Sequence, residues 1–401
     1  MNKTAYSFLL FGAAILAFMA ILPPAFGRDA SVKELGLQGK TSVKGIVILV
    51  TFSDVDNSVD KNRVQMRFTR HLNAYIREMS YGKVSLEVDV TKDWIKMPKP
   101  VSRYRISSRN LQVDKSRVRE LIDDALHQAD KEVDFSRYSF TVIFMKASLQ
   151  EYGMIGLCGY PGMLGWGSKD SLKLASGESV KGGVAIFCFQ AHLGTLFHDV
   201  AHILGGVREG KRMVPCLYDH DLQAKPGPMR KTFLDAIINM GFWDPMSCHF
   251  YRWNLPPPGL SSWTKMRLNW LDTSKIKIVR PGERAELMLD PLEEGSAETL
   301  VVKIPISAAT YYLVENRQPI GFDKNLPGSG ILIMVADDRI AECRHGKAPV
   351  RLMDANPSIP HLEGAAYDIG GKDTFEDPKN KIRIQLREKI GGTYRITVSP
   401  L

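Results

Sequence analysis

The stretch that decides the fold, residues 185–206, reads AIFCFQAHLGTLFHDVAHILGG. Its first residues are apolar and predict a short strand, and a turn separates them from a second apolar run that predicts a helix. The pair Gly205 and Gly206 is suited to a left-handed C-cap at the end of that helix. His198 and His202 are four residues apart, so they share one helix face. From such a face a single helix can supply two ligands to a zinc ion.

The two histidines nearly match the zinc metalloprotease motif His-Glu-x-x-His. In that motif the residue after the first histidine is the general base, a glutamate, and here the position holds Asp199. The alternative is a buried helix whose histidines bond to backbone or carboxylate partners. Nine histidines in 401 residues give such a pair by chance about 0.2 times, so the spacing alone does not decide between the two interpretations.

The N-terminus has the pattern of a secretory signal peptide. Lys3 precedes an apolar run over residues 5–21, and small residues precede a cleavage position after Gly27. Cleavage there would give a secreted or extracytoplasmic protein, in the periplasm or at the cell surface, and the alternative is an uncleaved N-terminal anchor. No later run is long and apolar enough for a bilayer, so we expect no stable membrane span after signal removal.

The composition is that of an ordinary globular protein, with 44% hydrophobic and 24% charged residues. The formal net charge of +9 is scattered along the chain, and no nucleic-acid motif accompanies it, so we expect no nucleic-acid partner. In an exported chain the five cysteines would allow two disulfides and leave one over. They are Cys158, Cys188, Cys216, Cys248 and Cys343.

Periodic segments on both sides of the histidine stretch predict an α/β layer followed by a β-rich region. Strands are expected at 45–52, 83–90 and 140–145, and helices at 64–79 and at 118–129 with Asp114 as N-cap. The glycine-rich segment 149–181 lacks periodicity and is predicted to be a loop. After residue 275, short alternating runs predict a β-sandwich or barrel. These runs are 276–279, 285–289, 300–304, 311–314, 331–335, 382–386 and 394–398.

A zinc site needs a third protein ligand, and the polar strip after the histidine helix holds the candidates. They are Cys216, Asp219, His220 and Asp221, the last three of which can equally be turn or surface residues. Further along, Met246 lies in a tight Asp-Pro turn, the kind that supplies an apolar floor beneath the metal in metzincins. The alternative for Met246 is a plain core position.

Taken together, these segments resemble the immune-inhibitor-A type metalloproteases, a secreted family of metzincin-like zinc endopeptidases. The family's run His-Glu-x-x-His-x-x-Gly-x-Pro-Asp-Leu-Tyr-Asp is similar to residues 198–206 followed, after eight inserted residues, by 215–219. Its Trp-Asp-x-Met turn is matched by residues 243–246, and its Ser-x-Trp-x-Lys-x-x-Leu-x-Trp run by 261–270. Residues 79–83, 312–318 and 321–333 also resemble family segments, so the likeness extends from about residue 44 to the end.

The resemblance implies a signal peptide (1–27), a short leader arm (28–43), a metzincin-like α/β (α+β) catalytic domain (44–275) and an all-β C-terminal domain (276–401). It implies zinc as cofactor, held by His198, His202 and a third ligand, with Asp199 in the place of the catalytic glutamate. Met246, Asp244 and Gly205 would support the site. Cys216 stands where the family has its third-ligand aspartate. A disulfide with Cys248, which follows the methionine turn, would remove it and leave Asp219 or His220.

The expected function is therefore a secreted zinc metalloendopeptidase, a hydrolase that acts on a protein or peptide substrate with weakened activity. Asp199 is one methylene shorter than the usual glutamate, and a misplacement of about 1 Å can cost on the order of a hundredfold in rate. A thiolate ligand donates more charge than a carboxylate and makes zinc a weaker Lewis acid. The alternative is a catalytically inactive metalloprotease-like protein that serves as a binding or scaffold module.

Overall fold

The computed structural model describes residues 39, 41–107, 113–165, 172–174, 176–177, 179–180, 182–223 and 229–401. The predicted signal peptide and most of the predicted leader arm lie outside these residues. The arm's last two residues, 42 and 43, already belong to the first strand. Residues 34–401 form one compact unit. Within the described part, no helix has the length and apolarity that a membrane crossing requires.

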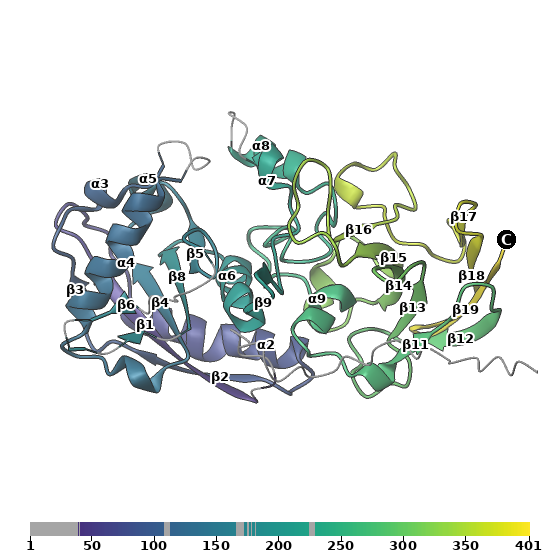
Figure 1. Cartoon of the computed structure of the whole chain (residues 1–401), viewed down its shortest axis with the longest axis horizontal. Helices are drawn as coiled ribbons and strands as arrows, with labels where there is room; N and C mark the ends of the chain where they lie inside the picture. Colours follow the sequence, from purple (N-terminus) through teal and green to yellow (C-terminus); the bar gives the residue numbers. More distant parts are fainter. Residues whose placement is uncertain are drawn as a thin grey trace, which may run out of the picture. The chain divides into compact units, whose positions relative to one another are not determined.

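A six-stranded sheet forms the N-terminal half, with strand order β2-β1-β4-β8-β5 and with β3 paired to β1 (Figure 1). Its strands are β1 (Ser42–Thr51), β2 (Ser85–Val90), β3 (Ile95–Lys96), β4 (Phe140–Met145), β5 (Gly156–Tyr160) and β8 (Gly183–Cys188). All pairs are parallel except the one between β5 and β8, so β5 is an antiparallel edge strand. The apolar strands β4 and β8 are buried along their whole length, as expected for parallel strands covered on both faces.

Helices cover both faces of this sheet. Alternate residues of β1 point to opposite sides, with Val47 in one core cluster and Ile48 in the other. The first cluster includes residues of α1 (Lys61–Met66), the π-helix η1 (Arg67–Leu72), α2 (Asn73–Met79) and α6 (Leu193–Gly205). The second includes residues of α3 (Val101–Tyr104), α4 (Lys115–Ala129) and α5 (Leu149–Tyr152). Helix α6, which carries the histidine pair, is therefore fixed by its apolar face against the sheet.

Most upstream predictions are confirmed, and one is wrong. Asp114 caps α4 by accepting the backbone N–H groups of Ser116 and Arg117. The predicted loop at 149–181 instead contains α5, β5 and the small hairpin β6 (Leu172–Lys173) and β7 (Ser179–Val180). Strand β5 escaped prediction because it is a short edge strand with two glycines and no apolar alternation, so its partner β8 rather than its own pattern makes it a strand.

The C-terminal part contains two sheets that share one buried core. One consists of β11 (Ile276–Ile278), β13 (Val301–Pro305), β14 (Thr310–Arg317), β15 (Gly330–Asp337) and β16 (Val350–Leu352). The other consists of β12 (Ala285–Leu289), β19 (Thr393–Pro400), β18 (Ile382–Ile390) and β17 (Thr374–Asp377). Each predicted run coincides with a strand, while β16 and β17 are additional. The chain is thus a mixed α/β structure with several sheets, compatible with the predicted class.

Short elements connect these parts. They are η2 (Phe135–Arg137), β9 (Val207–Arg208), β10 (Lys211–Arg212), α7 (His220–Gln223), α8 (Met229–Ala236), α9 (Ser262–Arg267), η3 (Thr273–Lys275), η4 (Gly321–Asn325) and η5 (Pro360–Leu362). The main hydrophobic core runs across the predicted boundary at residue 275, because Leu313 and Leu332 of the C-terminal strands belong to the same cluster as Val200 of α6.

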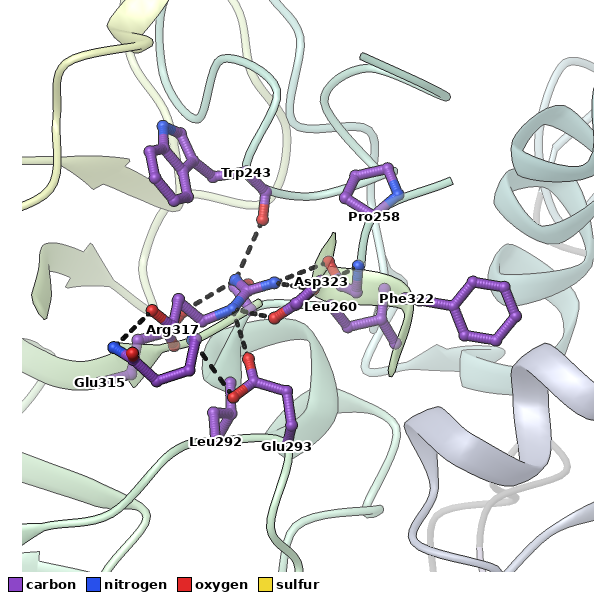
Figure 2. Close-up of polar contacts among 12 residues, drawn as sticks. Trp243, Pro258, Leu260, Leu292, Glu293, Glu315, Arg317, Phe322 and Asp323 are labelled. Carbon is purple, nitrogen blue, oxygen red and sulfur yellow. Dashed lines mark hydrogen bonds and ion pairs between the residues drawn. The ribbon is translucent and has the colours of Figure 1, made fainter. Parts of the chain in front are cut away.

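A buried ionic network also crosses that boundary (Figure 2). Arg317 of β14 donates from Nε and Nη2 to the two carboxylate oxygens of Asp323, at 2.7 and 2.9 Å. Its Nη1 donates to Glu315 at 3.1 Å and to the carbonyl of Trp243 at 3.2 Å. Because Trp243 opens the turn that contains Met246, a side chain of the C-terminal sheet holds that turn in place.

Candidate metal centre

Three side chains from two segments converge at the end of α6. His198 and His202 come from the helix, and Cys216 comes from the irregular segment after β10. The Cys216 Sγ lies 3.4 Å from His198 Nε2 and 3.5 Å from His202 Nε2. All three residues are no more than 3% exposed. Among the described residues, the ligand atoms of these three lie close enough together to hold a metal ion.

Both histidines are oriented by carbonyl groups on their other nitrogen. His198 Nδ1 lies 3.0 Å from the carbonyl oxygen of Pro245, and His202 Nδ1 lies 2.6 Å from that of Val214. A carbonyl can only accept, so Nδ1 carries the proton and Nε2 keeps its lone pair free for a metal. Gly205 permits the second contact, because a Cβ at Gly205 would come within 2.6 Å of the Val214 side chain.

The predicted methionine turn lies beside this group. Met246 is fully buried, and its carbonyl accepts the backbone N–H of Leu217 at 2.7 Å, which fixes the residue next to Cys216. Asp244 accepts the Met246 backbone N–H at 2.8 Å and the Ser261 hydroxyl at 2.6 Å, so it ties the turn to the start of α9. The turn therefore supports one histidine through Pro245 and the cysteine through Leu217.

Asp199 is buried between α6 and the edge strand β5. A Cβ at Gly156 of β5 would come within 3.1 Å of its Oδ2, so the carboxyl group packs directly on that strand. Burial raises the pKa of Asp199 to about 7, against the opposing effects of His198 and of a hydrogen bond from the Cys158 backbone. A carboxylate whose pKa lies near neutrality is suited to accept and return a proton.

The sulfur of Cys216 has several polar neighbours. Burial alone would raise its pKa, but His202, His198 and His220 together hold the pKa of the thiol well below its ordinary value. Tyr218 lies with its hydroxyl 3.3 Å from the sulfur. A thiolate is the form that binds metal, so the environment of Cys216 favours its use as a ligand.

Of the other candidate third ligands, His220 is hydrogen-bonded to Cys216 and lies 3.6 Å from Glu342, whereas Asp219 and Asp221 have partners away from the centre. Asp219 accepts the backbone N–H groups of Asp221, Leu222 and Gly346 at 2.9 to 3.1 Å. Asp221 pairs with Arg344 at 3.0 Å. These contacts make Asp219 a turn residue at the start of α7 and Asp221 an ion-pair partner.

The disulfides that the sequence allowed are absent, since all five cysteines are free and buried. In particular, Cys248 does not pair with Cys216, because its thiol donates to the carbonyl of Phe250 at 3.3 Å. Cys158, which the sequence placed in a loop, lies on β5 and donates to the carbonyl of Pro161. The cysteines are therefore core residues, with Cys216 placed beside the histidine pair.

Sequence reasoning missed two residues of the site. The ring of Tyr218 stacks on that of His198 with centroids 5.8 Å apart. The ring of His249 lies 4.6 Å from that of His198, and its Nδ1 lies 3.0 Å from the Thr195 hydroxyl. Its buried Nε2 has no hydrogen-bond partner among the residues that the structure describes. The only local signal was proximity in sequence, two residues after Cys216 and three after Met246.

A comparison of the chain with models of protein families finds no match, and a comparison with curated proteins finds no significant one.

Proposed function

We propose that the protein is a zinc-dependent endopeptidase of the metzincin-like type, and that His198, His202 and Cys216 hold the metal. The observation that carries the proposal is the convergence of these three ligand atoms at the end of one helix, with Asp199 next to the first ligand. The resemblance to secreted metalloproteases supports the reaction class and an extracytoplasmic location. The Trp-Asp-x-Met turn that carries part of this resemblance lies beside the centre, where the carbonyl of Pro245 accepts from His198 Nδ1 and Asp244 accepts the backbone N–H of Met246.

The two nitrogen-to-sulfur distances suit zinc. Tetrahedral zinc with Zn–N of about 2.0–2.1 Å and Zn–S of about 2.3 Å requires an N to S separation of about 3.5 Å. The two observed separations, 3.4 and 3.5 Å, match this value. Two imidazoles and one thiolate are also borderline-soft ligands, and such ligands bind zinc in preference to magnesium or calcium.

Zinc at this position would supply a Lewis acid for a water molecule and for a peptide carbonyl. The chain's own contribution is the base. Asp199 would accept a proton from water and pass it to the departing amine, as a positioned carboxylate does in general acid–base catalysis. Because Asp199 is shorter than glutamate and packs on β5, we expect turnover to be slow.

A second function is favoured by the burial of the centre. The three ligands are 2 to 3% exposed and Asp199 is 5% exposed, and the rings of Tyr218 and His249 lie against His198. A closed site of this kind suits a structural metal in a binding protein that does not hydrolyse peptides. The two functions share the metal and differ only in access to it.

The test combines metal content with proteolysis. We expect one zinc per purified chain and cleavage of casein that stops with a chelator and returns with added zinc. Asp199→Asn should keep the metal and lose at least a hundredfold in rate, because general-base catalysis contributes on the order of 10² to 10⁴. His198→Asn should lose both. Asp56→Asn, at an exposed aspartate, is the matched control and should change neither.

The outcomes separate the two functions. Bound zinc without cleavage, in wild type and in Asp199→Glu alike, would leave the non-catalytic metal protein as the function. A chain that binds no zinc would exclude both.

A further inference from the structure

The third ligand is held by residues from the far end of the chain. Cys216 lies in a segment without regular secondary structure, so its position depends on tertiary contacts. The segment 338–349, which joins β15 to β16, reaches this region. Within it, Glu342 accepts two hydrogen bonds from Arg212, from Nε at 2.9 Å and from Nη2 at 2.8 Å. Arg212 belongs to β10, in the stretch of eight residues inserted between the second and third ligands.

The same carboxylate faces His220 from the other side. His220 Nε2 lies 3.6 Å from Glu342 Oε2, and the His220 backbone N–H donates to the carbonyl of Cys343 at 3.1 Å. The His220 side chain is also hydrogen-bonded to Cys216, and Arg212 lies within electrostatic reach of the Cys216 sulfur. Glu342 thus bridges two groups that flank the third ligand.

Two more hydrogen bonds join the segment 338–349 to the residues that follow Cys216. The backbone N–H of Gly346 donates to Asp219 at 3.0 Å, and that of His345 donates to Asp221 at 2.9 Å. Together, residues 342–346 contact the chain on both sides of Cys216. Since the arginine pair is bidentate and only 10% and 21% exposed, it is a geometrically specific contact rather than a loose surface ion pair.

We propose that Glu342 is a positioning residue of the metal centre, which holds Arg212 and His220 in place and thereby fixes Cys216 as the third ligand. The affinity for zinc then depends on the connection between β15 and β16 that carries Glu342. Without the carboxylate, the Arg212 guanidinium loses its partner and is drawn to the thiolate, where it competes with the metal. Partners outside the ligand shell typically change metal affinity by about 10- to 100-fold. The inference rests on the proposed metal binding and not on peptidase activity.

The experiment compares Glu342→Gln with Glu376→Gln in the full chain. Glu376 of β17 and Arg383 of β18 form an ion pair whose side chains are 45% and 43% exposed, so the Glu376 variant is a matched control. Zinc affinity is measured by chelator competition, and the sulfur-to-cobalt charge-transfer band is recorded on the cobalt-loaded proteins. We expect Glu342→Gln to bind zinc about 10- to 100-fold more weakly and to alter the band, with an unchanged circular dichroism spectrum. The control should match wild type in all three.

The outcomes distinguish the absence of a positioning role for Glu342 from the absence of a metal site. If wild type binds no metal, the proposed function is wrong. If wild type binds zinc, and Glu342→Gln binds it with the same affinity and the same cobalt band, Glu342 has no positioning role. Should Glu342→Gln not fold, Arg212→Lys carries the same test, because it keeps the charge but loses the bidentate fork. An unchanged zinc affinity in that folded variant would overturn the proposal.

Discussion

At the scale of single residues, Asp199 is the residue of the centre whose burial in charged form lowers the stability of the fold. Burial raises its pKa to about 7, compared with about 3.9 for an aspartate in an unfolded chain. Between these two values the folded chain keeps a proton that the unfolded chain has lost. The stability that Asp199 contributes is therefore fully present below about pH 4 and is lost as the pH rises through about 7.

We therefore expect Asp199→Asn to gain stability relative to wild type as the pH rises, with both proteins free of metal. A pKa shift of about three units corresponds to a change of at most about 4 kcal/mol in the difference in free energy of unfolding between the two proteins, from about pH 4 to about pH 8. Denaturant unfolding in the presence of a chelator measures the difference at each pH. Asp56→Asn, in which no buried charge is removed, should stay parallel to wild type. A difference for Asp199→Asn that does not change with pH would show that its carboxyl group titrates normally.

The residues of the centre also show where sequence reasoning stops. His198 and His202 were predictable because the spacing of four is a local property of one helix. Cys216 could be named only as one of several candidates, since the direction of a side chain in an irregular segment depends on contacts that are distant in sequence. His249 and Glu342 were missed for the same reason, because their partners are 51 residues (His198) and 130 residues (Arg212) away in the chain.

At the scale of elements, the fit between β5 and α6 places the base. Gly156 of β5 has no room for a side chain, since a Cβ there would meet Phe187 at 2.8 Å, Thr195 at 2.9 Å and Asp199 at 3.1 Å. Two of these three residues belong to α6. The edge strand can approach the helix this closely only with glycine at this position.

Gly156→Ala should therefore displace the Asp199 carboxyl group and strain the contact. We expect a loss of about 1–3 kcal/mol in the free energy of unfolding, as in other overpacked sites. We also expect a lower rate of peptide hydrolysis at unchanged zinc affinity, because Asp199 is not one of the three proposed ligands, His198, His202 and Cys216. Gly371→Ala is the control, as its Cβ would meet nothing nearer than 3.8 Å. Equal unfolding midpoints for the two variants would mean that β5 yields without cost.

The elements themselves were largely predictable, and the exceptions have a physical cause. Strands such as β4 are continuous apolar runs, and α4 has both a periodic apolar stripe and an aspartate cap, so each is specified by its own residues. Strands β5 and β16 are short and take their structure from a neighbour, β8 in one case and β15 in the other. The two N-terminal segments, 1–27 and most of 28–43, lie outside the described residues and remain predictions.

At the scale of the whole molecule, Arg317 joins parts that the sequence assigned to separate domains. It contacts the carbonyl of Trp243 before the methionine turn, the carbonyl of Gly259 at 3.0 Å, and two buried carboxylates, Glu315 and Asp323 (Figure 2). A third acid, Glu293, has its pKa raised to about 10 by burial and by Asp323, so it is protonated at neutral pH. Arg317 lowers the pKa of Asp323 against the effect of burial, whereas burial raises the pKa of Glu315 despite the nearby arginine.

Arg317→Met should lose about 3–5 kcal/mol in the free energy of unfolding, the usual cost when one partner of a buried ionic group is removed. The loss of stability should be smaller near pH 5 than at neutral pH. Without the arginine, Glu315 and Asp323 lose their paired counter-charge, and protonation at the lower pH removes more of their charge. Denaturant unfolding at both pH values measures this. Arg383→Met is the control, since its pair with Glu376 is about 43 to 45% exposed and should contribute less than about 1 kcal/mol. If Arg317→Met were no less stable than this control, the hydrophobic core alone would hold the turn against the C-terminal sheet. If its deficit were the same at both pH values, the arginine would be acting through packing and not through its charge.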